Sequence, residues 1–331
     1  MIMKDHIKGI TYGHDARRGS YRTRAAKESL IAALDLEVNY VCLAFTVYVE
    51  KFSSTDIYFD YRGTVTDSDL FYAISAIKAR GKAVFLRPML GCRDGASRQD
   101  ISFPDFPVTE NGISYWDEWF NSYGAFIRHY AEIAEDAGVE LFCIGSELTS
   151  TERHGSRWRD IIMSVRNIYS GQLVYSANAG GESKIRWWEL LDYIGIVAYP
   201  EIGNEATAGV SDIEQSIETL VREWEIAARR YESAALQYNK HIIFTESGCR
   251  SVLGAASRPW DYLAQAVANQ QEQAAFIDTC LAVMTRKSWF KGVFWWGWTV
   301  ESYPPEQVDA DVSYNIRYKM AERILKRWNL K

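Results

Sequence analysis

Short apolar runs alternate with longer amphipathic segments along the whole chain. Apolar residues at helical spacing fill seven segments, at 24–34, 67–80, 123–137, 158–169, 213–238, 265–285 and 314–328. Eight shorter runs are typical of buried strands, at 9–12, 40–45, 83–87, 141–144, 173–177, 193–198, 241–244 and 292–296. Strands that alternate with helices in this way predict an α/β fold with a parallel sheet.

Eight strand-and-helix units match a (β/α)₈ barrel, for which roughly 250 residues is typical. The chain has 331 residues, so we expect a single barrel domain over 1–331 with the surplus in loops. Gly81, Gly138 and Gly171 follow three predicted helices, where left-handed C-caps are expected. A doubly wound sheet is the competing fold, but no GxGxxG phosphate loop follows the first strand.

The predicted long loops all follow strands. The largest runs from Gly91 to about Trp119 and is rich in Asp, Ser, Pro and aromatic residues, and the others are 200–211, 248–260 and 299–311. On a barrel these loops share one face, so we expect them to build one substrate cleft.

Composition excludes several classes of protein. Lys and Arg number 37 against 43 Asp and Glu, and this negative balance argues against a nucleic-acid partner. Aromatic residues make up 14% of the chain, with 12 tryptophans, which suggests a cleft that stacks on weakly polar ligands in addition to core packing. The cysteines are an odd, scattered set without a CxxC pair, so we expect reduced thiols and no structural zinc; they are Cys42, Cys92, Cys143, Cys249 and Cys280.

The first residues suggest a cytoplasmic protein without a membrane partner. Lys4, Asp5 and Lys8 precede any apolar run, and no stretch approaches about 18 uncharged apolar residues. A signal peptide removed beforehand would leave the same sequence, so secretion stays an alternative. The oligomeric state is left open.

Two glutamates stand at the ends of strongly apolar runs. Glu147 ends Leu-Phe-Cys-Ile-Gly-Ser-Glu, and Glu246 ends His-Ile-Ile-Phe-Thr-Glu. Burying a carboxylate there is costly unless it has a partner or a function. These runs are the fourth and seventh predicted strands, so both glutamates are expected at the carboxyl-end mouth of the barrel. Paired carboxylates there can divide the acid and nucleophile roles of a retaining glycosidase. The alternative is that each glutamate forms an ion pair with an arginine such as Arg87 or Arg250.

Four motifs together resemble glycoside hydrolase family 113. They are Gly9-Ile-Thr-Tyr-Gly13, Ile144-Gly-Ser-Glu147-Leu, Phe244-Thr-Glu246-Ser-Gly and Val293-Phe-Trp-Trp-Gly-Trp298. The resemblance runs from Lys8 to about Trp298, and the order and spacing of the motifs are more specific than any one of them. It implies a (β/α)₈ barrel of the retaining clan, with catalytic glutamates on strands four and seven.

By this resemblance Glu147 is the acid/base, Glu246 is the nucleophile and the substrate is β-1,4-linked mannan or manno-oligosaccharide. Ser146 stands where much of the clan has Asn, and the third strand ends Leu86-Arg-Pro-Met-Leu90 where relatives more often have Lys-Pro-His. The resemblance also places Trp296 beneath the sugar in the cleaved subsite and makes Tyr199 the hydrogen-bond donor that holds the nucleophile.

Other residues are candidates from their positions alone. Asn178, Arg87 and Tyr12 follow or end strands and are candidate donors to sugar hydroxyls, whereas Trp298 is either a cleft or a core residue. Strand alternation turns Trp295 away, to pack against a helix. For Trp116 and Trp119, packing at a helix start is favoured over extension of the cleft. His14 and Asp15 fall short of a metal ligand set, so we assign no metal and no cofactor.

The sequence therefore predicts a retaining β-1,4-mannanase that acts by double displacement, with transglycosylation as a built-in possibility. The alternatives are the same machinery on another β-linked glycan, such as β-glucan, xylan or β-glucoside, and a barrel that binds sugar without cutting it. Internal or terminal cleavage depends on how the loops at 91–119 and 299–311 close.

Overall fold

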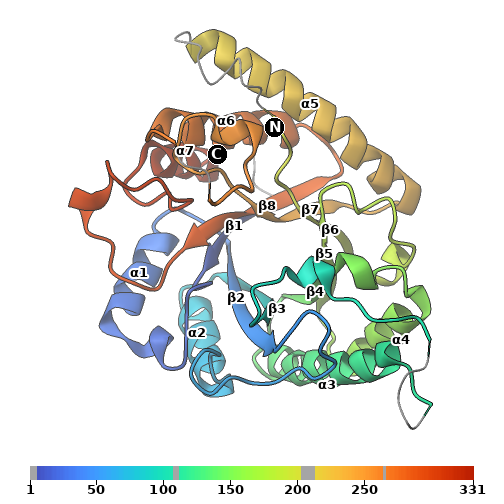
Figure 1. The fold of residues 1–331 in the computed structure, drawn as a ribbon. Helices are drawn as coiled ribbons and strands as arrows, with labels where there is room; N and C mark the ends of the chain where they lie inside the picture. Colours follow the sequence, from blue (N-terminus) through green and yellow to red (C-terminus); the bar gives the residue numbers. More distant parts are fainter. Residues whose placement is uncertain (1–5, 107–111, 203–212, 264–265) are drawn as a thin grey trace. The chain divides into compact units, whose positions relative to one another are not determined.

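The computed structural model describes residues 6–106, 112–202, 213–263 and 266–331. Its eight parallel strands close into a barrel in the order β1 to β8 (Figure 1). The strands are β1 (Ile7–Tyr12), β2 (Tyr40–Val49), β3 (Ala83–Cys92), β4 (Leu141–Ser146), β5 (Gln172–Asn178), β6 (Tyr193–Val197), β7 (Ile242–Ser247) and β8 (Phe290–Trp298). The predicted (β/α)₈ fold is thus confirmed, and every predicted strand is present.

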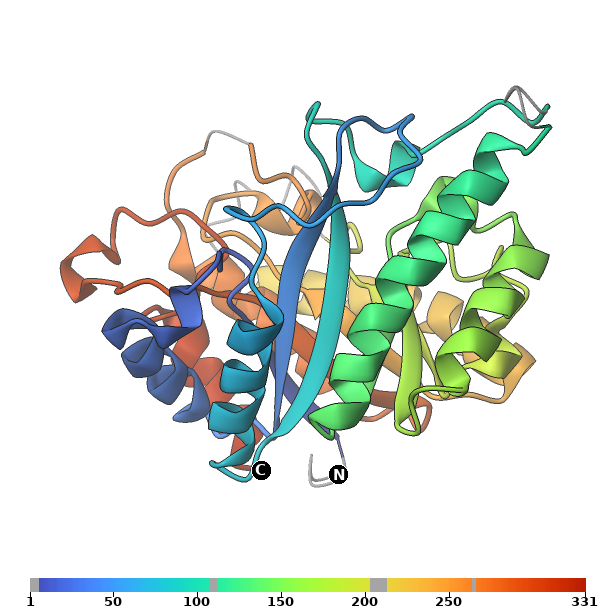
Figure 2. The same ribbon diagram turned by 90° about the horizontal axis from the view of Figure 1, so that it is seen from below.

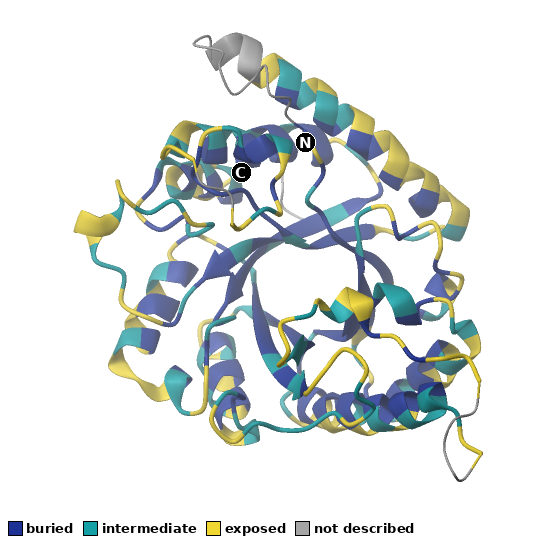
Figure 3. Ribbon diagram, viewed as in Figure 1, coloured by how far each residue is buried: buried dark blue, intermediate teal, exposed yellow. Residues whose placement is uncertain are grey.

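The described residues form seven α-helices. They are α1 (Arg24–Leu34), α2 (Asp67–Lys78), α3 (Tyr115–Asp136), α4 (Gly155–Arg166), α5 (Ile213–Tyr238), α6 (Gln270–Met284) and α7 (Met320–Asn329). The strands are largely buried, whereas each helix shows a buried and an exposed side (Figure 3). This burial is expected of a parallel barrel, whose strands are covered on both faces and whose amphipathic helices lie outside. No described helix has both the length and the apolar character needed to span a membrane.

The chain divides into two compact units that share the strands of the barrel. One comprises Met1–Tyr12, Arg24–Val41 and Ile196–Lys331, and the other comprises Gly13–Thr23 and Cys42–Gly195. In the first, β8 pairs with β1 and β7, and α6 packs between α5 and α7. In the second, β4 pairs with β3 and β5, and α2 and α3 lie on either side of β2 and β3 (Figure 2). The prediction of a single domain stays a prediction.

Four helix starts differ from the predicted ones. Helix α4 begins at Gly155 rather than 158 and α6 at Gln270 rather than 265, and the starts of α3 and α7 differ by more. Helix α3 begins at Tyr115, because the Ser114 side chain accepts a hydrogen bond from the Asp117 backbone and caps the helix. The long loop after β3 is therefore shorter than predicted, and Trp116 lies inside the helix. Helix α7 begins at Met320 rather than 314.

Side chains between β8 and α7 prevent an earlier helix start. Asp311 accepts from the Ser313 backbone, Ser313 Oγ accepts from the Asn315 backbone, and Asn315 accepts from the Arg317 backbone. Such local hydrogen bonds compete with the helical pattern. The predicted helix over 314–328 was therefore wrong in its first turns.

The predicted glycine caps are confirmed at two of three sites. Gly81 and Gly138 have φ angles of 68° and 62°, in the left-handed region. Gly171 does not, because α4 ends five residues earlier, at Arg166. A Cβ at Gly171 would lie 2.2 Å from the Tyr169 hydroxyl oxygen, so this glycine permits a close approach instead.

Candidate active site

Glu147 directly follows β4 and has a left-handed backbone, with φ of 56°. This conformation is unfavourable for a residue with a Cβ. Its own N–H donates to the Ser176 carbonyl at 2.8 Å, and the N–H of Leu148 donates to the Tyr175 hydroxyl at 3.1 Å. The β4–β5 register also shifts between Cys143 and Ser146. Strand β5 therefore holds the unusual turn that presents the Glu147 side chain.

Two arginines lie at the Glu147 carboxylate. Arg98 Nη1 donates to Oε2 at 2.9 Å, and Arg87 Nη2 lies 3.8 Å from the same oxygen. The arginine contact expected under the ion-pair alternative is thus present. It leaves 18% of the Glu147 side chain exposed, so the carboxylate remains accessible.

Arg98 was not among the predicted site residues. It begins a short 3₁₀ helix, η3 (Arg98–Asp100), in the loop after β3, and its Nη1 also contacts the Met89 sulfur at 3.4 Å. Only the path of this long loop brings Arg98 to Glu147, 49 residues along the chain. No local motif marks such a residue.

Ser146, the residue before Glu147, is held by Arg87. Arg87 is fully buried, and its Nη2 donates to Ser146 Oγ at 2.7 Å. Asn178 ends β5, and its Nδ2 donates to Thr149 Oγ1 at 3.1 Å in the segment after Glu147.

A second, buried carboxyl lies behind the Glu147 turn. Tyr175, which accepts from the Leu148 N–H, donates to Glu152 Oε1 at 2.8 Å. Burial raises the pKa of Glu152 to about 7, assisted by the charge of Glu182 and opposed by the Tyr175 hydrogen bond and Lys184. Sequence reasoning missed Glu152, because its position on a loop does not reveal its burial.

Glu246 lies in β7 and is half-buried among fully buried neighbours. The Tyr199 hydroxyl donates to its Oε1 at 2.7 Å. The Glu246 carbonyl accepts from the Ala198 N–H at 2.7 Å, and Ser247 Oγ donates to the Ala198 carbonyl at 2.7 Å. Backbone and side-chain bonds therefore tie the residues after β6 to the end of β7, and the expected contact between Tyr199 and the carboxylate is present.

Tyr314 adds a second aromatic ring beside Tyr199. The two rings lie 6.2 Å apart in a T-shaped arrangement. Burial raises the pKa of Tyr314, and the negative charge of Glu246 adds to this rise. A Cβ at Gly248 would lie 2.9 Å from the Trp296 carbonyl and 3.3 Å from the Tyr314 ring, so the close approach requires glycine. Sequence analysis placed Tyr314 in a helix and therefore missed it.

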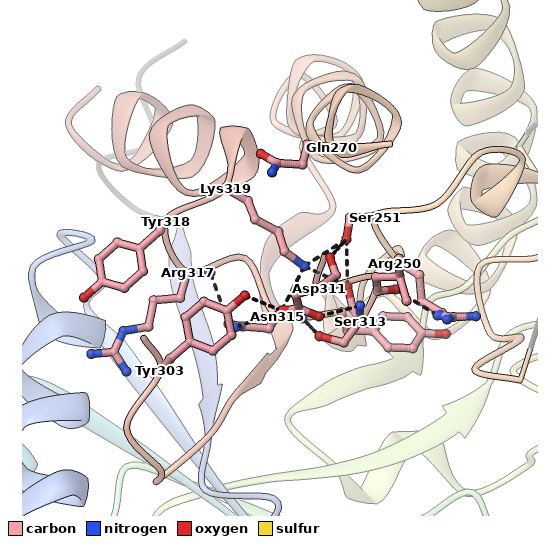
Figure 4. Close-up of polar contacts among 12 residues, drawn as sticks. Arg250, Ser251, Gln270, Tyr303, Asp311, Ser313, Asn315, Arg317, Tyr318 and Lys319 are labelled. Atoms are coloured by element: carbon pink, nitrogen blue, oxygen red, sulfur yellow. Dashed lines mark hydrogen bonds and ion pairs between the residues drawn. The ribbon is translucent and has the colours of Figure 1, made fainter. Parts of the chain in front are cut away.

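A buried polar cluster fixes the loop that carries Tyr314 (Figure 4). The Lys319 side chain has no exposed surface, and its Nζ lies 3.2 Å from Asp311 Oδ2 and 2.8 Å from Ser251 Oγ. Ser251 Oγ donates to the Asp311 carbonyl at 2.8 Å. Arg250 Nε donates to the Val312 carbonyl at 3.1 Å. Side chains from the segment after β7 therefore bond to the segment after β8, and the Lys319 side chain of the latter bonds back to Ser251.

The tryptophans of β8 differ in burial. Trp296 is half-buried, whereas Trp295 and Trp298 are almost completely buried. Trp298 Nε1 donates to Ser29 Oγ and to its carbonyl, each at 3.0 Å, which ties it to α1. The Tyr12 hydroxyl donates to the Ala26 carbonyl of α1 at 2.8 Å. Trp298 is thus a core residue, whereas Trp296 has the exposure that a sugar-stacking ring needs.

The remaining candidates lie in the core or outside the described residues. Trp116 and Trp119 are buried in α3, in accord with the packing role. Burial lowers the pKa of His14, against the effect of Asp15.

In the described ranges, no three His, Cys, Asp or Glu side chains gather as a metal site, and no disulfide joins the cysteines. Residues 203–211 of the predicted loop 200–211 lie outside the described residues.

A closed eight-stranded parallel barrel with a glutamate at the end of strands four and seven has the architecture of a (β/α)₈ glycoside hydrolase. The model of Glycoside Hydrolase Family 113 matches residues 10–319. The chain belongs to this family.

Solved structures agree with that assignment. A GH113 β-1,4-mannanase determined as a complex is 30% identical, with a TM-score of 0.89 and 99% of both chains covered. The GH113 β-mannanase AaManA from Alicyclobacillus acidocaldarius, in complex with ManMIm, is 32% identical, with a TM-score of 0.88 and 98% and 97% covered. The β-glucuronidase of Ruminococcus gnavus shares the fold, with 13% identity, a TM-score of 0.61 and coverage of 98% of this chain and 50% of its own. No curated protein sequence matches the chain.

Proposed function

We propose that the chain is a retaining β-1,4-mannanase that cleaves mannan or manno-oligosaccharides by double displacement. One observation carries the proposal: in a chain similar over 99% of its length to a β-1,4-mannanase, Glu147 directly follows the fourth strand and Glu246 is the last residue but one of the seventh. The mechanism requires the two carboxylates to lie about 5 to 5.5 Å apart across the scissile bond.

Glu246 is the proposed nucleophile. One oxygen attacks the anomeric carbon, the bond to the leaving oxygen breaks, and a covalent glycosyl-enzyme forms. The hydrogen bond from Tyr199 to Oε1 supports this role, because it fixes the carboxylate orientation before attack. The half-buried Trp296 indole is the proposed stacking platform beneath the sugar.

Glu147 is the proposed acid/base. It protonates the leaving oxygen in the first step and takes a proton from water, or from another sugar hydroxyl, in the second. The Arg98 contact occupies Oε2, the atom at 2.9 Å from the guanidinium. We propose that the leaving oxygen of the substrate replaces Arg98 there. The Asn178 amide is the proposed donor to sugar hydroxyls on this side, whereas the Arg87 side chain has no exposed surface and holds Ser146 instead of reaching the sugar.

The substrate assignment is tested by comparing mannotetraose with cellotetraose under identical conditions. Faster hydrolysis of mannotetraose is expected, and faster hydrolysis of the gluco sugar would replace mannan by a β-glucan as the substrate. Proton NMR of the first product must show the β-anomer before mutarotation, because double displacement retains configuration. The α-anomer as first product would reject the mechanism.

We also propose a cytoplasmic location, in which imported manno-oligosaccharides are the available substrates. Cell fractionation with an antibody against the chain tests this location. Recovery from the culture medium would show that the enzyme is secreted.

A further inference from the structure

A cavity of about 540 Å³ opens in the unit that contains β2 to β5, on the outer side of β2. Its walls come from Val47 of β2, the segment between β2 and α2, the first turn of α2, and the middle of α3. Figure 2 shows β2 and β3 between α2 and α3. The volume falls within the range typical of small-molecule sites, about 300 to 1,000 Å³.

The cavity is separate from the contacts of Glu147. Those contacts come from Arg87 of β3, Arg98 of η3, and Ser176 of β5. None of these three residues lines the cavity. A ligand seated in the cavity would therefore bind without displacing the groups that hold the proposed acid/base.

One wall of the cavity is aromatic. Tyr61 is 75% exposed, and its ring meets that of Phe59 edge to face at 5.3 Å. Phe126 and Tyr130 are buried and meet edge to face at 5.5 Å. Their mutual packing holds both rings in place at the bottom of the cavity. An exposed ring above a firm apolar floor suits the C–H face of a pyranose.

The polar groups of the cavity favour a neutral ligand. Asp67 Oδ1 lies 3.0 Å from His129 Nε2, and these side chains are 47% and 48% exposed. A paired carboxylate and imidazole present an acceptor and a donor side by side, which suits neighbouring hydroxyls. The Asp67 carboxylate repels phosphate and carboxylate ligands, and the guanidinium of Arg18, which also lines the cavity, offsets its charge, so the lining favours neither anions nor cations. A polyhydroxylated, uncharged ligand fits this lining best.

We propose that this cavity is a second carbohydrate-binding site, which takes one or two sugar units of a neutral β-mannan chain. The choice of mannan rests on the proposed function, whereas the choice of a neutral sugar rests on the lining. A second site on the same molecule raises the effective concentration of long chains at the enzyme without new contacts to the reacting bond.

Native gel electrophoresis through galactomannan tests the site in the Glu246→Gln background, which leaves the polymer intact. Loss of one stacking contact, in Tyr61→Ala, is expected to weaken retardation about fivefold. Asp67→Asn tests the polar side independently and is expected to weaken it by a similar factor. Phe71→Ala is the matched control, since Phe71 is an exposed ring on α2 that does not line the cavity.

Activity in the otherwise unaltered enzyme gives the second readout. Tyr61→Ala is expected to leave the turnover of mannotriose unchanged and to raise the KM for galactomannan about three- to tenfold. Equal losses on the short and the long substrate would overturn a separate site. Unchanged retardation in the Tyr61→Ala/Asp67→Asn double variant, folded by its thermal midpoint, would also overturn it.

The test separates this inference from the proposed function. If the parent fails to cleave mannotetraose, the proposed function fails whatever the gels show. If it cleaves but the cavity variants bind mannan like Phe71→Ala, only the second site fails. Retardation by hydroxyethylcellulose instead of galactomannan would overturn the mannan assignment, and a dimer that dissociates in Tyr61→Ala would identify the cavity as an interface between copies.

Discussion

The Tyr199 hydroxyl donates a 2.7 Å hydrogen bond to Oε1 of Glu246. Tyr199→Phe removes this donor and keeps the ring. A hydrogen bond to a charged group contributes about 1.5 to 3 kcal/mol, so we expect kcat on mannotetraose to fall about 10- to 100-fold, with KM changed less than about threefold. Steady-state kinetics measure both. Tyr193→Phe, at the start of β6, is the matched control, and its hydroxyl accepts from Gln172.

Replacing each of the two glutamates by Gln is expected to reduce turnover in a different way. Glu246→Gln removes the nucleophile and abolishes turnover of every substrate. Glu147→Gln removes a general acid that contributes about 10²- to 10⁴-fold, so the loss is large on mannan and small on an aryl mannoside with a good leaving group. Azide should restore the second step in Glu147→Gln and yield a β-mannosyl azide. Activity within about tenfold of the parent for either variant on mannan would contradict these roles.

Glu152 makes stability depend on pH in an uncommon direction. Its pKa is raised to about 7 from 4.5, so the folded chain holds this proton through a range in which the unfolded chain releases it. The associated stability is present below about pH 4.5 and is lost as pH rises through 7. This amounts to about 3 kcal/mol.

Glu152→Gln is expected to remove that dependence. Urea unfolding at pH 5 and pH 8 should show the parent losing about 2.5 kcal/mol relative to the variant, since a small part of the stability is already lost at pH 5. Glu189→Gln is the control, because Glu189 is half-exposed and paired with Arg159. A difference between parent and Glu152→Gln that is equal at both pH values would contradict the assignment.

The buried pair of Lys319 and Asp311 is expected to be costly to break. Lys319→Met leaves the mostly buried Asp311 carboxylate without its cation, and the free energy of unfolding should fall by about 3 to 5 kcal/mol. Lys319→Met/Asp311→Asn should lose less than the sum of the single variants. Lys287→Met, whose partner Glu225 is partly exposed, should cost under about 1 kcal/mol. Additive losses in the double variant would show that the pair is not coupled.

The barrel was predictable from sequence, because alternation of apolar runs with amphipathic segments depends on local periodicity. The errors occur where side chains bond to nearby backbone. Ser114 caps α3 earlier than the apolar pattern indicates, and Asp311 and Asn315 hold turns where the pattern predicts helix. These bonds satisfy backbone groups without changing hydrophobic spacing, so a periodicity argument does not register them.

The site was predictable where strands carry it. Glu147, Glu246 and Tyr199 end or follow apolar strands, and sequence marks such positions. Arg98 reaches the Glu147 carboxylate, and Tyr314 reaches the Tyr199 ring, from long loops whose paths depend on contacts far along the chain. The sequence also left the cleft and core roles of Trp298 open. Strand alternation and a tryptophan-rich motif do not reveal that its indole donates a hydrogen bond to Ser29.

The contacts of Lys319 with Ser251 and Asp311 affect how loops can be exchanged between relatives. Because Ser251 and Asp311 share one buried cation, the segment 248–252 and the segment 311–319 behave as a single exchangeable module. Transplanting 311–319 alone would bring Lys319 and Asp311 without the Ser251 hydroxyl that accepts from Nζ, and transplanting 248–252 alone would bring Ser251 without that ammonium. A chimaera that aims to import new subsites from a relative should therefore carry both segments together with their lysine.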